Sequence, residues 1–68
     1  MRVTGLSSGD LLNVRSGPGT SHGIVGKLGN GDQVRTINCQ MQGSSRWCEI
    51  EMMSEMRERG WVDARYLQ

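Results

Sequence analysis

The chain of 68 residues contains no phenylalanine, and its aromatic side chains are limited to two tryptophans and one tyrosine. Small barrels that bind RNA or DNA stack bases on clustered aromatic rings, which this sequence does not supply. Its charge is also nearly balanced, because eight Lys and Arg face seven Asp and Glu and leave a net charge of +1. A nucleic-acid binder usually has a clear basic patch. We therefore expect no nucleic-acid partner.

Long apolar runs are absent too. No stretch approaches the roughly 20 apolar residues of a membrane-spanning helix. Residues 1–4 (MRVT) have no apolar core of the kind that a signal peptide carries. We expect no membrane span, and we expect any export signal to lie outside this chain. The length predicts one domain, residues 1–68, and we expect it to be a monomer.

Ten glycines and a single proline disfavour long helices, because glycine loses much backbone entropy when it is ordered. Proline and glycine at the second and third positions of residues 17–20 (GPGT) predict a type II turn. Residues 29–32 (GNGD) predict a second tight turn, with Asn-Gly as the usual hairpin dipeptide. Extended runs are predicted around residues 2–6, 11–15, 23–28, 34–41, 46–52 and 60–62. Together they predict an all-β fold, a small barrel or sandwich of five to six short strands.

The connection at residues 51–59 (EMMSEMRER) has good helix formers, but nine residues without a glycine cap make a marginal helix. The strand expected behind it favours a hairpin with a loop or helical turn near residues 54–55. Farther on, Asp63 is expected to cap a short 3-10 turn over residues 64–66 before the chain returns to the barrel.

The two cysteines lie in apolar-alternating runs on either side of the turn-forming residues 42–45 (QGSS). A hairpin centred between residues 43 and 44 places Cys39 opposite Cys48, Ile37 opposite Ile50 and Gln40 opposite Trp47. Directly opposed residues of a non-hydrogen-bonded pair have α-carbons about 4.5 Å apart, which permits a disulfide. Closing this loop of about ten residues would contribute roughly 2 to 3 kcal/mol.

Two other interpretations of the cysteines exist. They could stay reduced and pack as small hydrophobic side chains, or they could form half of a metal site with His22. Their spacing is not that of a zinc knuckle, and the chain has no fourth soft ligand, so no metal is expected. The hairpin register favours the disulfide, which would place the domain outside the cytosol, in a periplasm or beyond.

Three segments carry a resemblance to a known family: residues 12–34 (LNVRSGPGTSHGIVGKLGNGDQV), 46–50 (RWCEI) and 60–67 (GWVDARYL). In this pattern the sequence resembles the bacterial SH3-like domains (SH3b, SH3 type 3). The resemblance implies a strongly bent barrel of five to six strands with a 3-10 turn before the last strand. Paired cysteines at these positions resemble those of exported members, which agrees with the register argument.

Such domains accompany cell-wall amidases, endopeptidases and other envelope proteins, where they are thought to hold the partner domain near peptidoglycan. The resemblance therefore implies that residues 1–68 are excised from a longer protein with an attached domain. The charged 51–59 connection departs from the family pattern by replacing a shorter turn. The chain also lacks the acidic, aromatic-rich signature of eukaryotic SH3 domains, so recognition of PxxP peptides is not expected.

Four residues are the candidates for ligand binding. Asn13 and Arg15 alternate with Leu12 and Val14, so they face away from the predicted core, although both can instead bond to backbone groups of the nearby turn. Trp47 falls on the face opposite Cys48 and is the better candidate for a surface platform, although tryptophan in a small barrel is as often a core or hairpin-packing residue. Tyr66 can offer its hydroxyl at a groove edge while its ring packs inward. Trp61 is predicted beside the core, and His22 on an exposed loop.

Catalysis is not expected, because no nucleophile has a positioned base. The carboxylates of residues 49–58 lie among arginines, which predicts cross-strand charge pairing. The glycine-rich stretch lacks the lysine and helix start of a phosphate-binding loop. No cofactor is expected. The leading hypothesis is a non-catalytic, periplasmic or extracellular module that binds peptidoglycan, most plausibly its peptide portion. The alternative is a structural module that docks onto a neighbouring domain or an envelope protein.

Overall fold

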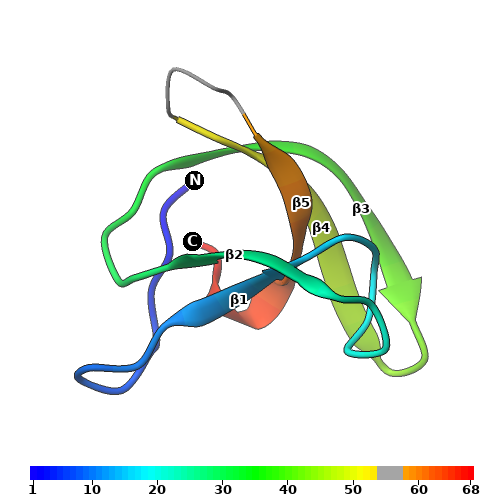
Figure 1. Cartoon of the computed structure of the whole chain (residues 1–68), viewed down its shortest axis with the longest axis horizontal. Coiled ribbons are helices and arrows are strands. Elements are labelled where there is room, and N and C mark those ends of the chain that lie inside the picture. The colour runs from blue at the N-terminus through cyan, green and yellow to red at the C-terminus, as the bar shows by residue number, and fades with distance from the viewer. Residues whose placement is uncertain (54–57) are drawn as a thin grey trace.

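The computed structural model describes residues 1–53 and 58–68, and these form one antiparallel sheet that bends into a barrel (Figure 1). Its strands follow the order β2-β1-β5-β4-β3, and a 3-10 turn, η1, precedes the chain end. The bounds are β1 Leu12–Arg15, β2 Ile24–Leu28, β3 Val34–Gln42, β4 Ser45–Met52, β5 Arg59–Asp63 and η1 Ala64–Tyr66. The prediction of an all-β barrel of five to six short strands with a 3-10 turn near the C-terminus is confirmed. No helix among the described residues is long and apolar enough to span a membrane.

The core is made of small aliphatic side chains and one half of the cystine. In β1, Leu12 and Val14 are buried while Asn13 and Arg15 are half-buried, as the alternation predicted. The buried cluster comprises Val3, Leu12, Val14, Leu28, Val34, Cys48, Ile50 and Val62. With so few large side chains, this core is thin, as expected for a domain of this size.

The N-terminal segment closes the barrel without forming a full strand. Residues 2–6 were predicted to be extended, but only two isolated bridges form there, Arg2 with Gln33 and Val3 with Leu67. Val3 is fully buried, and its N–H donates to the Asp32 carbonyl at 2.9 Å. Its backbone bonds to the chain end stop at Thr4, whose N–H donates to the Tyr66 carbonyl at 2.8 Å, and the next residue, Gly5, takes a positive φ of 83°.

The hairpin register is confirmed near the turn and wrong beyond it. Cys39 pairs with Cys48 and Gln40 with Trp47, and the cysteines form a disulfide with α-carbons 4.0 Å apart. Ile37 was predicted to face Ile50, but β3 carries an extra residue between Thr36 and Asn38, so Thr36 takes that position. Such a bulge increases the bend of a strand. As a result, Ile37 is 41% exposed rather than packed with Ile50.

The predicted turn at residues 29–32 is present, whereas the turn after β1 is displaced from residues 17–20, because its hydrogen bond runs from the His22 N–H to the Gly19 carbonyl at 3.4 Å. Both segments contain a glycine with positive φ. Gly19 has φ of 126° and Gly31 has φ of 91°, a region that side chains other than glycine rarely enter. In the second turn, the Asp32 N–H donates to the Gly29 carbonyl at 3.1 Å. This turn joins β2 to β3, which lie at the two ends of the sheet order. It is therefore a corner of the barrel, although its Asn-Gly pair is typical of a hairpin between neighbouring strands.

The long connection at residues 51–59 belongs to a hairpin, as predicted. Glu51 of β4 pairs with Arg59 of β5, and their side chains form an ion pair at 3.5 Å. The Met52 N–H donates to the Glu58 carbonyl at 2.7 Å. The expected loop or helical turn near residues 54–55 lies outside the described residues.

Candidate ligand groove

A groove of about 320 Å³ runs beside β1 on the outer side of the sheet. All four residues that the sequence singled out for ligand binding line it, namely Asn13, Arg15, Trp47 and Tyr66. They come from β1, β4 and η1, segments that are far apart in the chain. The remaining lining residues are Leu6, Asp10, Leu11, Leu12, Thr20 and Asp63.

Strand alternation explains why these side chains meet. Asn13 and Arg15 face away from the core because Leu12 and Val14 fill it. On the central strands, Trp47 and Asp63 are direct cross-strand partners, and successive residues of a strand point to opposite faces. Cys48 and Val62, the next pair in that register, belong to the buried core. Trp47 and Asp63 therefore share the outer face with Asn13 and Arg15.

Trp47 lies deeper than a surface platform. Its side of the sheet was predicted correctly, since it is not part of the core cluster, but it is only 6% exposed. The prediction of a surface position is thus wrong. Its strand, β4, lies between β3 and β5, and Trp47 is paired with Gln40 on one side and with Asp63 on the other. Trp47 forms part of the floor of the groove.

Trp61 was expected beside the core and instead lies on the outer face. Gly60 and Val62, its chain neighbours, are buried, while Trp61 is half-buried and outside the core cluster. In the sheet it stands between Arg15 of β1 and Glu49 of β4. Trp61 does not line the groove, whereas Trp47 does.

Arg15 supports the loop that follows β1. Its Nη1 donates to the His22 carbonyl at 3.1 Å, which confirms the bond to the glycine-rich turn that the sequence offered as an alternative role. His22 is exposed, as predicted. A β-carbon on Gly17 would lie 2.7 Å from the His22 ring, so the imidazole is packed against the backbone of its own loop.

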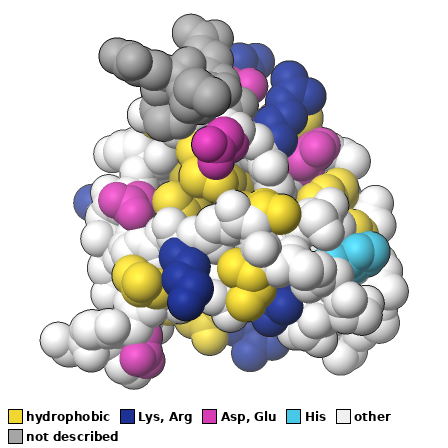
Figure 2. All heavy atoms as spheres, in the orientation of Figure 1, with side chains coloured by type: hydrophobic (Ala, Val, Ile, Leu, Met, Phe, Trp, Pro, Cys, Tyr) yellow, Lys and Arg dark blue, Asp and Glu magenta, His cyan; other side chains and the backbone are white. Residues whose placement is uncertain are grey.

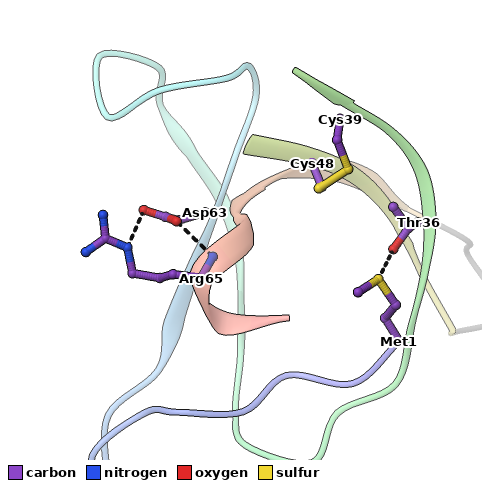
Figure 3. Close-up of a disulfide and its surroundings, with 6 residues drawn as sticks. All are labelled: Met1, Thr36, Cys39, Cys48, Asp63 and Arg65. Carbon is purple, nitrogen blue, oxygen red and sulfur yellow. Dashed lines mark hydrogen bonds and ion pairs between the residues drawn. A yellow bond between two sulfur atoms is a disulfide. The ribbon is translucent and has the colours of Figure 1, made fainter. Parts of the chain in front are cut away.

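Asp63 shapes the far wall of the groove and caps η1 (Figure 3). One carboxylate oxygen accepts a hydrogen bond from the Arg65 N–H at 3.0 Å, and the other lies 3.1 Å from Arg65 Nε. The predicted cap is confirmed. Because Arg65 engages both oxygens, the charge of this carboxylate is largely offset by its neighbour.

The loop before β1 also lines the groove, through Leu6, Asp10 and Leu11, and sequence reasoning did not include it. The Asp10 N–H donates to the Ser7 carbonyl at 2.9 Å and closes this loop. Asn30 fixes Leu6 from the opposite corner by two bonds: its Oδ1 accepts from the Leu6 N–H at 3.1 Å, and its Nδ2 donates to the Leu6 carbonyl at 2.9 Å. The turn at residues 29–32 thus positions a wall of the groove.

A second hollow of about 290 Å³ adjoins the first and shares Thr20, Trp47 and Asp63 with it. It lies between the loop after β1 and the β3–β4 turn, where a β-carbon on Gly19 would be 3.5 Å from the Gln42 side chain. Its further lining residues are Gly19, Gln42, Ser45 and Arg65. The two hollows together extend the groove toward the end of the hairpin.

The molecular surface carries a mixture of side-chain types. Acidic and basic side chains are interspersed on the face seen in Figure 2, with hydrophobic groups between them. Among residues 1–53 and 58–68, no three His, Cys, Asp or Glu side chains gather as metal ligands.

Comparison with known proteins gives one family. The sequence model of a family described as bacterial SH3 domain matches residues 9–68. No curated protein and no solved structure matched the chain.

Proposed function

Because this chain belongs to the bacterial SH3 domain family, we propose that it is a non-catalytic module that binds peptidoglycan through the groove beside β1. Members of this family often bind cell walls or peptidoglycan and are generally binding modules without catalysis. The proposal identifies the peptide portion of the wall as the ligand. It also places the protein in a periplasm or outside the cell, which agrees with the disulfide between Cys39 and Cys48.

The observation that carries this proposal is the convergence of Asn13, Arg15, Trp47 and Tyr66 on one groove. Asn13 offers both a donor and an acceptor, which suits the amide groups of an extended peptide. Arg15 offers a guanidinium, which suits a carboxylate. The two aromatic rings supply apolar contact together with a polar N–H or O–H. Stem peptides of peptidoglycan combine amides, carboxylates and methyl groups, so the groove matches their chemistry.

Docking onto a neighbouring domain or envelope protein is the second candidate. It is favoured by apolar side chains on the edge strand β2, where Ile24 is 49% and Val25 is 51% exposed. Exposed apolar groups of this kind often mark contacts between proteins. This surface is separate from the groove, because neither residue lines it.

Co-sedimentation with purified sacculi tests the proposal. The intact domain should be retained by the sacculi, and Asn13→Ala should weaken retention because it removes polar groups from the groove. Asn38→Ala is a matched control, since Asn38 is exposed on β3 and does not line the groove. Loss of retention in both variants alike would exclude the groove as the binding site. No retention of the intact domain would exclude wall binding and favour docking.

A further inference from the structure

The second hollow, of about 290 Å³, is built by segments that are far apart in the chain. Ser45 lies two residues before Trp47 in β4, so both side chains point to the outer face of the sheet. Gln42 is the direct cross-strand partner of Ser45, and such partners lie on the same face. Thr20 lines the hollow from the loop after β1. The hollow therefore has its floor on the β3–β4 hairpin and a wall on a separate loop.

The hydrogen-bonding side chains of the second hollow are neutral and free for a ligand. Thr20 and Ser45 each carry a hydroxyl and Gln42 carries an amide, and each of these groups both donates and accepts. In the part of the chain that the structure describes, none of the three side chains forms a hydrogen bond. The two charged residues of the hollow, Asp63 and Arg65, are joined at 3.1 Å, so their charges largely offset each other. The hollow thus favours neutral polar groups over an ion.

Trp47 adds an indole N–H to this surface. The residue is 6% exposed, and its Nε1 forms no hydrogen bond with the other residues that the structure describes. No buried side-chain nitrogen or oxygen among these residues lacks a hydrogen-bond partner, so the Nε1 atom is not fully buried. Because Trp47 lines both hollows, its exposed part lies where they meet. The N–H is available there to an acceptor on a ligand, and the rest of the ring offers apolar contact.

We infer that the second hollow is a subsite for a neutral sugar that carries an acetamido group. Several neutral donors and acceptors around so small a space suit a ligand with adjacent hydroxyls, which a sugar ring supplies and a peptide backbone does not. The Gln42 amide matches an acetamido group, because each of the two groups both donates and accepts. The inference rests on the proposed function in one respect: the glycan of peptidoglycan consists of N-acetylated amino sugars, so the sugar would lie beside the peptide in the groove.

The subsite is tested by an NMR titration of the labelled domain with N,N′,N″-triacetylchitotriose, and with cellotriose as the matched sugar that lacks acetamido groups. Chitotriose should shift the signals of Thr20, Gln42, Ser45 and the Trp47 indole N–H, and cellotriose should bind more weakly. Gln42→Ala removes one neutral hydrogen-bonding group and should weaken chitotriose binding about twofold to tenfold. Gln40→Ala is the matched control, because Gln40 is exposed on the same strand and lines neither hollow. It should leave the affinity unchanged.

The source of the sugar is tested with three fragments of peptidoglycan, namely the disaccharide, the stem peptide, and the disaccharide joined to the stem peptide. The joined fragment should bind more tightly than either part, because the second contact becomes intramolecular once the first has formed. Gln42→Ala should reduce this gain, and Gln40→Ala should not.

Three results would overturn the subsite: no binding of chitotriose, equal binding of chitotriose and cellotriose, or equal losses in Gln42→Ala and Gln40→Ala. If chitotriose binds as expected but the joined fragment binds no better than the stem peptide, the subsite is supported and its place beside a bound peptide is overturned. Failure of the domain to be retained by sacculi is a separate result. It would overturn the proposed function and leave the chitotriose titration to decide the subsite.

Discussion

Loss of the disulfide between Cys39 and Cys48 is expected to destabilise the domain strongly. The bridge joins residues that are 9 positions apart, and closing such a loop in the unfolded chain is worth roughly 2.6 kcal/mol in the chain-entropy treatment. A chain of 68 residues has an unfolding entropy of about 0.14 kcal/mol/K near its midpoint. The ratio of these quantities gives a fall in Tm of about 18 °C.

Thermal unfolding of the oxidised and reduced protein, followed by circular dichroism and calorimetry, measures this fall. The reduced form keeps both sulfur atoms, so the difference isolates the covalent link. The double variant Cys39→Ala, Cys48→Ala should melt at or below the reduced protein, because Cys48 is 3% exposed and its truncation also removes core packing. Reductant should not change the Tm of this double variant.

Two results would refute the reasoning. Two free thiols counted in the native, unreduced protein would show that the bridge is absent. A Tm that falls by less than about 3 °C on reduction would show that the hairpin holds the two strands together in the unfolded ensemble without the bridge.

Three further substitutions test the structure, each by urea denaturation. Gly60→Ala should lower the free energy of unfolding by about 1 to 3 kcal/mol, because its methyl group would collide with the buried Val14 side chain. Gly23→Ala is the control and should change this free energy little, because no atom lies within 4 Å of a β-carbon there. Equal effects of the two substitutions would contradict the close packing at Gly60. Asn30→Ala removes both hydrogen bonds to Leu6 in the loop beside the groove and should lower the free energy of unfolding by about 1 to 2 kcal/mol. If the NMR shift changes were confined to residue 30, Asn30 would not be positioning that loop. Asp63→Ala should cost about 1 kcal/mol through loss of the cap, and Asp63→Asn, which keeps an acceptor, should cost less.

The parts of the fold that sequence analysis predicted correctly depend on local chemistry. The alternation of Leu12 and Val14 with polar residues set the inner face of β1. The positive φ at Gly19 and Gly31 was foreseeable because these turn positions demand glycine. Asp63 was a recognisable cap because its carboxylate acts on a backbone N–H two residues away.

The β3 bulge could not be predicted in the same way. A turn fixes register only until an extra residue enters one strand. Asn38 pairs with Glu49 as the turn requires, but beyond the bulge the register is shifted by one residue, so that Thr36 pairs with Ile50. The bulge allows the long strand β3 to bend around the barrel. Because this bend is a property of the whole sheet, the sequence near Ile37 does not indicate the bulge.

The sequence predicted the residues that the strands contribute to the candidate site, but not those that the loops contribute. Asn13 and Arg15 follow from alternation, and Trp47 was assigned to the correct face. Its depth depends on the strands on both sides of β4, which a single hairpin does not reveal. Asp10 was missed because it lies on a loop, and only the folded chain brings that loop to the groove.

The hairpin that carries the disulfide also carries part of the groove. Cys48 follows Trp47 directly, and Gln42 and Ser45 line the adjoining hollow near the turn of the same hairpin. The described residues form a small core of mostly aliphatic side chains, so little surplus stability is left to hold this part of the groove in place. Because the bridge joins β3 to β4 beside Trp47, it restrains the same strands that form the floor. The bridge therefore limits the conformational freedom that a ligand of this groove would otherwise have to restrict.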